Sequence, residues 1–231
     1  MNKPLIIASN VKNERHQLDE WYENLLPIAD GFLIVDTFST DGTFEFFKDK
    51  LNTVIIQSNI IVDEGYGPAR SNLRDLCKQH FPEAHWEFHL DGDERLDPDE
   101  FHQLRFLKET LIDKFDVIAF PRLNMLSKTG KETKNDLNVH PDYQARMTRL
   151  DSPMKYVRKL HEQVSGCSGI YAEFTNPKIL HYHRSTTEDK RTEIGKLCAK
   201  LRMEDDVYGH TVPEHHKEKH YRELYLKEGF K

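Results

Sequence analysis

Two aspartates separated by a single glycine follow an apolar run that predicts a strand. The run is residues 86–90, and Asp91, Gly92 and Asp93 come directly after it. In an open parallel sheet, ligands bind beyond the carboxyl ends of the strands, so these carboxylates are expected at the ligand edge. Paired carboxylates suit a Mg²⁺ or Mn²⁺ ion that also takes phosphate oxygens, and a glycine lets the backbone approach the ligand. An isolated motif of this kind is more often a solvated turn; its place after a strand and before a helix favours a site.

Three further polar side chains occupy comparable places. Asp36 ends the apolar run 32–35, so we expect it at the same edge, accepting hydrogen bonds from a base or ribose. Asp41 precedes a glycine and a helical pattern, which is typical of a turn or N-cap residue. Arg70 falls in the first turn of a helix that follows two glycines. Its guanidinium could pair with a diphosphate or form a surface salt bridge, and the segment alone favours neither.

The elements that must position these residues alternate along the first 100 residues. Apolar runs that predict buried strands are separated by segments whose apolar residues recur at helical spacing. The predicted strands are residues 5–8, 32–35, 54–56 and 86–90. This alternation predicts an α/β fold with a mainly parallel central sheet flanked by helices.

The second half has a different pattern. A strand at 117–120 is followed by a polar stretch, 127–138, that predicts an exposed loop, and then by short alternating segments. Ser185 to Glu188 has the spacing of a capping box and opens a helical pattern. We therefore expect one domain over residues 1–184, with its halves meeting at 123/124, and a helical C-terminal extension over 185–231.

Composition narrows the classes of function. The chain has 231 residues, 37% hydrophobic and 31% charged, with a net charge of −6. An acidic balance argues against a nucleic-acid interface, which needs a basic face. Three scattered cysteines fit reduced thiols in a cytoplasmic protein. The apolar run at 5–8 is too short for a signal peptide or a membrane span, so any membrane contact is expected to be peripheral.

Four sequence blocks, taken together, resemble the family 2 glycosyltransferases, which have the GT-A fold. The order and spacing of the blocks cover about the first 100 residues. The blocks are Val11-Lys12-Asn13-Glu14, Val35-Asp36-Thr37-Phe38-Ser39-Thr40-Asp41-Gly42-Thr43, Ala69-Arg70-Ser71-Asn72 and Leu90-Asp91-Gly92-Asp93-Glu94. One departure is Phe38, where the family usually has glycine.

The resemblance implies an inverting transfer of a sugar from a nucleotide diphosphate donor, most commonly UDP-linked, to a glycan, lipid-linked or protein acceptor. It implies that Mg²⁺ or Mn²⁺ bridges the diphosphate. The positions that match the family's nucleotide-sugar site are Asn13, Glu14, Asp36 (base), Arg70, Asp91 (ribose or metal), Gly92 and Asp93 (metal).

Looser matches in the second half suggest the remaining roles. Leu160-His161-Glu162 is similar to the family's His-Glu pair, which makes Glu162 the expected catalytic base, with Asp142 as the alternative. Glu162 could instead be a structural partner of Arg158 or Arg149. His181 is similar to a later strand histidine of the family, and it is either a further metal ligand or an ordinary strand residue.

Two other functions compete with this interpretation. A sugar-phosphate nucleotidyltransferase would need a glycine-rich basic loop after the first strand, and residues 9–14 contain no glycine. A catalytically silent module that binds a nucleotide sugar stays open, because binding residues can persist without a base.

Overall fold

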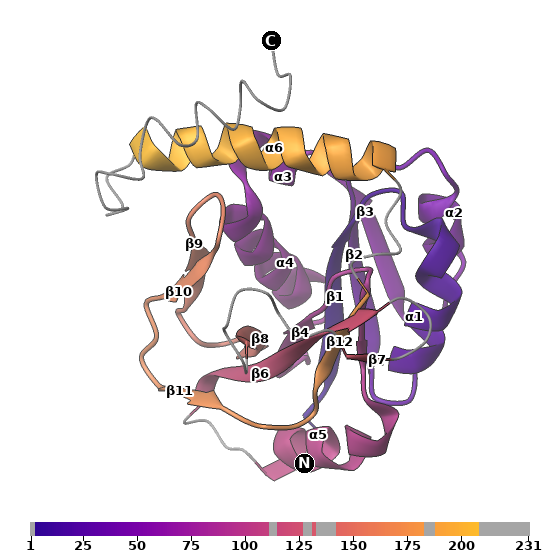
Figure 1. Cartoon of the computed structure of the whole chain (residues 1–231). Coiled ribbons are helices and arrows are strands. Elements are labelled where there is room, and N and C mark those ends of the chain that lie inside the picture. The colour runs from indigo at the N-terminus through magenta and orange to yellow at the C-terminus, as the bar shows by residue number, and fades with distance from the viewer. Residues whose placement is uncertain (1–2, 111–114, 127–130, 133–141, 183–187, 208–231) are drawn as a thin grey trace.

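The computed structural model describes residues 3–110, 115–126, 131–132, 142–182 and 188–207 as a layered α/β arrangement (Figure 1). In chain order the strands are β1 (Leu5–Val11), β2 (Gly31–Asp36), β3 (Thr53–Gln57), β4 (Trp86–His89), β5 (Glu94–Leu96), β6 (Phe115–Leu126), β7 (Lys131–Glu132), β8 (Asp142–Arg149), β9 (Lys155–Val157), β10 (Gln163–Ser165), β11 (Ile170–Glu173) and β12 (Ile179–His181). The large sheet has the order β3-β2-β1-β4-β8-β6-β12-β5, with β7 and β11 paired to β6. Strands β9 and β10 form a separate antiparallel hairpin.

The strands of the first half pair in parallel, as their apolar runs predict. Ile7 of β1 lies opposite Phe32 of β2 on one side and opposite Phe88 of β4 on the other. Strands β2 and β4 are buried along their whole length, which is typical of parallel strands covered on both faces. Because the strands run the same way, their carboxyl ends meet at one edge, where Val11 lies opposite Asp36.

The second half makes the sheet mixed. Strand β8 is antiparallel to both of its neighbours, β4 and β6, while β12 is parallel to β6 and antiparallel to β5. Antiparallel neighbours need no crossover helix, so alternation of strands and helices cannot reveal them. Strand β5 contains Glu94 and Arg95, two charged residues in a run of three, and no strand was predicted there.

Helices cover both faces of the sheet. Their bounds are α1 (Leu18–Leu25), α2 (Thr43–Lys48), α3 (Ile60–Glu64), α4 (Tyr66–His80), α5 (Phe101–Thr110) and α6 (Glu188–Val207), with 3-10 turns at Arg15–Gln17 and Pro98–Glu100. One core cluster contains side chains of α1, α2 and α5, and a second contains side chains of α4. Figure 1 accordingly shows α1 and α2 on one side of β1 and β2 and α4 on the other.

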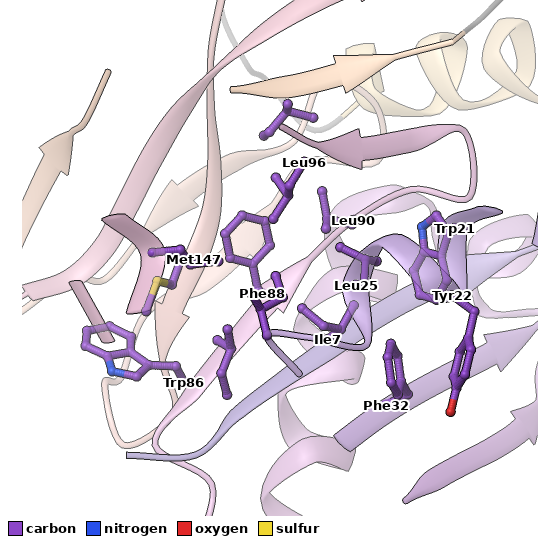
Figure 2. Packing of buried hydrophobic residues seen from close by; sticks show 14 of the residues in the cluster. Ile7, Trp21, Tyr22, Leu25, Phe32, Trp86, Phe88, Leu90, Leu96 and Met147 are labelled. Atoms are coloured by element: carbon purple, nitrogen blue, oxygen red, sulfur yellow. The ribbon is translucent and has the colours of Figure 1, made fainter. Parts of the chain in front are cut away.

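The larger core cluster is rich in aromatic rings (Figure 2). Trp21 lies 5.9 Å from Phe32 and 5.9 Å from Phe47, ring centroid to ring centroid, the second pair edge to face. Such pairs contribute about 0.5–1.5 kcal/mol beyond the area they bury. The Trp21 indole N–H also donates to the Asp91 carbonyl at 3.1 Å, so the core holds the backbone of the Asp91-Gly92-Asp93 motif.

Helix α6 falls within the predicted C-terminal extension and contacts both halves of the chain. Lys200 Nζ donates to the Val62 carbonyl at 3.0 Å, and Lys159 forms an ion pair with Glu204 at 2.6 Å. Among the described residues, no helix has the length and apolar character that crossing a membrane requires. The capping-box residues 185–187, and all of the predicted loop 127–138 except 131–132, lie outside the described residues.

Candidate functional site

Asp36 lies at the carboxyl edge of the sheet, where the sequence predicts it, and is buried. Its carboxylate accepts hydrogen bonds from the Ser39 amide at 3.0 Å and from Gln57 Nε2 at 3.0 Å. Its exposed fraction is 0%. A contact with a nucleobase or ribose would therefore require one of these hydrogen bonds to be exchanged.

Asn13 joins the loops that follow β1 and β2. Its amide donates to Ser39 Oγ at 2.8 Å, and its side-chain Oδ1 accepts from the Thr40 amide at 2.8 Å. The next contacts continue this pairing, because Glu14 donates its amide to Thr43 Oγ1 and Arg15 donates its amide to Asp41 Oδ2, both at 2.9 Å. Two of the resembling blocks thus meet side by side.

Glu14 also reaches the aspartate motif. A Cβ at Gly92 would lie only 2.9 Å from Glu14 Cγ, so a residue larger than glycine would displace the Glu14 side chain. Gln17 Nε2 donates to Glu14 Oε2 at 2.5 Å. The structure therefore brings the predicted residues Glu14 and Gly92 into contact.

Phe38, in the loop after β2, has an unusual backbone conformation for an aromatic residue. Its φ of 51° lies in the left-handed region, which is costly for an aromatic residue and suits the glycine that the resembling family usually has. Its side chain is 49% exposed. Burial in the core does not account for the aromatic residue here, since half of the ring faces outward.

Asp91 is held by three basic side chains. His89 Nε2 lies 3.0 Å from Oδ1, Arg146 Nη2 donates to Oδ2 at 3.1 Å, and Arg70 Nη2 lies 3.5 Å from Oδ2. Partial burial raises the pKa of Asp91, but Arg146 and Arg70 lower it by more, and the net pKa is well below the ordinary value. Both carboxylate oxygens therefore already have cationic or hydrogen-bonding partners.

Arg146 reaches Asp91 because of a bulge in β8. Ile118 of β6 lies opposite Met147, and the next residue, Ala119, lies opposite Ala145, so Arg146 has no opposite residue. A bulge re-aims a side chain, and here Arg146 points at two acidic groups. Its Nη2 also donates to Glu94 Oε1 at 2.6 Å. Burial raises the pKa of Glu94 and Arg146 opposes this, leaving the pKa above the ordinary value.

Asp93 and His181 face each other across the strand pair β5–β12. Their Oδ2 and Nε2 atoms are 3.3 Å apart. On its other side, the His181 Nδ1 lies 2.7 Å from Asn124 Oδ1, an acceptor, which assigns the ring proton to Nδ1. Burial lowers the pKa of His181, but the hydrogen bond and charge of Asp93, together with the charge of Glu94, raise it by more, so the structure favours a proton between Nε2 and Asp93 Oδ2. A cation could take the place of that proton.

This arrangement fits a divalent cation with two protein ligands. No group of three or more acidic, histidine or cysteine residues in the described part of the chain could hold a metal ion. Mg²⁺ and Mn²⁺ are commonly held by one or two protein groups, with waters and phosphate oxygens completing the shell. Asp93 and His181 could supply these two. Asp91 is engaged by arginines, so its geometry suits a positioning or ribose contact better.

Glu162 is paired with Arg70. Arg70 Nη1 lies 2.7 Å from Glu162 Oε1, and both side chains are largely buried. Burial raises the pKa of Glu162, but Arg70 lowers it by more, so the carboxyl is ionised with a pKa below its ordinary value. Arg70 therefore joins Asp91 and Glu162 in one network, and the surface salt bridge that the sequence left open is excluded by its burial.

The start of α4 fixes the segment that leads to Glu162. The Tyr66 and Gly67 amides donate to the carbonyls of Lys159 and Arg158 at 2.8 and 3.1 Å. A Cβ at Gly67 would lie 2.3 Å from the Arg158 carbonyl oxygen, so only glycine permits this approach. The segment from the second half is thereby fastened to the helix that carries Arg70.

Asp142, the alternative base, has other partners. Its Oδ2 accepts from Arg122 Nη2 at 2.8 Å and its Oδ1 accepts from Gln144 Nε2 at 2.7 Å. Arg122 lies 3.9 Å from Glu94, at the margin of the acidic cluster. A cavity of about 430 Å³ is lined by Glu162 and Arg70, and Asp142 is not among its described lining residues. Glu162 is thus the better placed of the two carboxylates.

The sequence does not identify His89 and Arg146 as members of the site, and it assigns no role to Glu94. All three are buried. A charged residue such as Arg146 inside an otherwise apolar strand is a usable signal, because arginine is almost never fully buried unless it is paired. Its direction could not be predicted, since the bulge depends on pairing between β6 and β8.

Comparison with known proteins supports the fold. No protein-family model matches the sequence, and no curated protein sequence matches it. A crystal structure of S. aureus TarS matches 98% of this chain with 15% identity and a TM-score of 0.51, and the chain spans 43% of its length. A structure of S. aureus TarS 1–349 matches 93% of this chain with 15% identity and a TM-score of 0.50, with 68% of its length spanned. The chain therefore has the predicted GT-A fold, a mixed α/β fold with a curled central sheet flanked by helices.

Proposed function

We propose that this protein is an inverting glycosyltransferase that uses a nucleotide diphosphate sugar, UDP-linked in the first instance, and a divalent cation. The observation that carries the proposal is the convergence of Asp93 with His181, at 3.3 Å, beside the network of Arg70, Asp91 and Glu162. Asp93 and His181 suit a cation. Glu162, next to the Arg70 guanidinium, suits the role of an ionised base.

In the proposed reaction the Glu162 carboxylate takes the proton of an acceptor hydroxyl. The acceptor oxygen forms a bond to the anomeric carbon while the bond from that carbon to the diphosphate oxygen breaks. The electron pair leaves with the nucleoside diphosphate, and the configuration inverts. A cation bound by Asp93 and His181 would stabilise the charge of the leaving group. Arg70 lies within reach of both carboxylates and can pair with the diphosphate.

The acceptor of this reaction is a glycan, a lipid-linked molecule or a protein, and the proposed location is the cytoplasm. All three cysteines are free thiols, in keeping with a reducing compartment.

A panel of nucleotide sugars, incubated with and without Mn²⁺, tests the function. Slow, metal-dependent release of nucleoside diphosphate supports glycosyl transfer. Release of pyrophosphate from a sugar phosphate and a nucleoside triphosphate would instead indicate a nucleotidyltransferase. Binding of a nucleotide sugar without turnover would indicate a catalytically silent module. The ion pair between Arg70 and Glu162 keeps this alternative open, because Arg70 already engages the carboxylate of the proposed base.

The Asp93→Asn variant ties the result to the proposed metal site. We expect it to lose about 10²-fold or more of its turnover, because a bound metal supplies several kcal/mol of stabilisation. Asp99→Asn is the matched control, since Asp99 is an exposed carboxylate six residues further along the chain. Equal activity of the two variants would remove Asp93 from the site.

A further inference from the structure

The cavity beside Glu162 lies away from the proposed cation site. It has a volume of about 430 Å³ and is lined by Arg70 and Glu162 on one side. Among the described residues, its lining does not include Asp36, Asp93 or His181. Small-molecule sites usually measure about 300–1,000 Å³, so this volume suits a small polar unit. The cavity therefore reaches Glu162 and Arg70, and its described lining does not include the proposed cation ligands.

The rest of the wall consists mainly of neutral hydrogen-bonding and aromatic side chains. Tyr143 and Tyr171 contribute phenol rings, and Gln144 and Gln163 contribute carboxamides. A phenol combines an apolar face with a polar tip, and a carboxamide both donates and accepts. A ring with vicinal hydroxyl groups and an apolar C–H face matches these side chains, since its hydroxyls can hydrogen-bond to the carboxamides and its C–H face can pack on a phenol ring. Tyr171 is 46% exposed, so its ring is accessible from outside.

The charge of the wall argues against other acceptors. Arg70 is the one cation among the described lining residues, and it is already paired with Glu162 at 2.7 Å. A phosphate-bearing acceptor would need a cation besides Arg70, because Arg70 is also the residue proposed to pair with the donor diphosphate. The aliphatic lining side chains are Ala145 and Val164, too little apolar surface for a prenyl tail. The wall therefore favours an uncharged hydroxylated ligand.

We propose that this cavity is the acceptor subsite and that the acceptor it takes is a sugar residue, with a hydroxyl directed at Glu162. The assignment of the reacting hydroxyl rests on the proposed function, while the binding of a sugar to the cavity does not. The two are therefore separable by experiment.

Cys167 gives a measurement that is independent of turnover. Its thiol is exposed and lines the cavity, whereas Cys77 is buried and Cys198 lies on α6, outside the cavity. Alkylation of each cysteine by N-ethylmaleimide at pH 8 is followed by peptide mass spectrometry in the full-length protein. Methyl β-D-glucopyranoside and methyl N-acetyl-β-D-glucosaminide are the probes, without donor or metal.

We expect at least one glycoside to slow the alkylation of Cys167 and to leave Cys198 unchanged. At a concentration about four times its Kd, the rate falls about fivefold, the factor 1 + [L]/Kd. Gln163→Ala and Tyr171→Ala should weaken the protection, and Glu173→Ala, an exposed residue on the same strand as Tyr171, should not. Asp93→Asn should keep it, because the cation site is separate.

The outcomes distinguish this inference from the proposed function. Protection by a serine-containing tripeptide or by geranyl phosphate, and not by glycosides, would overturn the assignment to carbohydrate. If neither glycoside protects Cys167 or gives a saturation-transfer NMR signal, while a nucleotide sugar is still hydrolysed, the inference fails and the proposed function stands. If a glycoside protects Cys167 but no nucleotide sugar is hydrolysed, the inference stands and the proposed function fails.

Discussion

At the scale of single residues, the site is a set of buried charges that hold one another in place. Arg146 has an exposed fraction of 0% and bonds to Asp91 and Glu94. Arg70 forms an ion pair with Glu162 and also lies 3.5 Å from Asp91. Each carboxylate thus depends on a guanidinium for its ionisation and its direction, and the loss of either guanidinium leaves a buried negative charge.

Arg146→Met should destabilise the protein by about 3–5 kcal/mol, because it leaves the buried Glu94 carboxylate uncompensated. Urea unfolding measures the change in free energy. Arg15→Met is the matched control, since Arg15 pairs with Asp19 on the surface and such pairs contribute less than about 1 kcal/mol. Adding Glu94→Gln to Arg146→Met should recover part of the loss. Equal effects of the two arginine substitutions would contradict the ion-pair account.

Glu162→Gln should lower turnover about 10²–10⁴-fold, the usual contribution of a positioned base. The affinity for the nucleotide sugar should change far less, since the amide keeps the size of the side chain. Initial rates and titration calorimetry measure the two quantities. Asp142→Asn is the comparison variant, and a larger loss of turnover there would transfer the role of base to Asp142.

At the scale of elements, β4 carries a buried carboxyl within the sheet. Glu87 accepts a hydrogen bond from Thr148 Oγ1 at 2.7 Å, yet burial raises its pKa to about 7, with Arg74 opposing the shift. The folded protein thus binds a proton here more tightly than the unfolded chain, whose glutamate pKa is about 4.5. Between pH 4.5 and 7 the unfolded state loses its proton first, so the stability of the folded state falls as the pH rises.

Glu87→Gln removes this titration. We expect the free energy of unfolding of the wild type, relative to the variant, to fall by about 3 kcal/mol between pH 4.5 and 8. Urea unfolding at several pH values measures the difference. Glu45→Gln, at an exposed position on α2, should show no such trend. A pH-independent difference for Glu87→Gln would show that this carboxyl does not titrate in the window.

Gly67→Ala should destabilise the protein by about 1–3 kcal/mol, the usual effect of inserting a methyl group where there is no room. The new Cβ would meet the carbonyl oxygens of Arg158 and Val157 at 2.3 and 2.7 Å. Gly195→Ala is the matched control, because a Cβ there meets nothing within 4 Å and alanine favours the helix by about 0.5–1 kcal/mol. Thermal unfolding should give opposite signs, and equal signs would refute the close approach.

The elements also show how far sequence reasoning reaches. Strands β1 and β2 could be predicted because buried parallel strands are continuous apolar runs, whereas β3 is a short, partly buried apolar run and β4 alternates apolar residues with Glu87 and His89. The place of Asp36 and Asp91 follows from those strands, since each residue comes directly after an apolar run. The sequence offered Arg158 or Arg149 as the partner of Glu162, but Glu162 pairs with Arg70. That pairing depends on backbone hydrogen bonds between α4 and residues 158–159, which leave no periodic pattern.

At the scale of the whole molecule, the parallel half and the mixed half meet at β4 and β8. Asp91 follows β4 and Arg146 lies in β8, so the central network spans this junction. The proposed cation ligands lie together in the mixed part of the sheet, but they come from the two halves of the sequence, since Asp93 precedes β5 and His181 ends β12. Ligands that bind both halves should therefore stabilise the entire fold.

UDP and Mn²⁺ added together should raise the Tm more than the sum of their separate effects. A ligand present at about 100 times its Kd stabilises the native state by about 2.7 kcal/mol, which corresponds to about 5–10 °C for a chain of this size. Differential scanning fluorimetry measures the shift. Asp93→Asn should abolish the synergy, and a fully additive response in the wild type would separate metal binding from nucleotide binding.

The fastening of residues 158–159 to α4 bears on how chains of this type could diversify. Because backbone hydrogen bonds hold the segment before Glu162, the position of that carboxylate does not depend on the side chains of β10 and β11. Gln163 and Tyr171 on these strands are exposed, so they tolerate replacement. Substitutions at these two positions would change which acceptors bind, while the position of Glu162 stays the same. Related proteins could therefore acquire new acceptor specificities by single substitutions without losing the reaction.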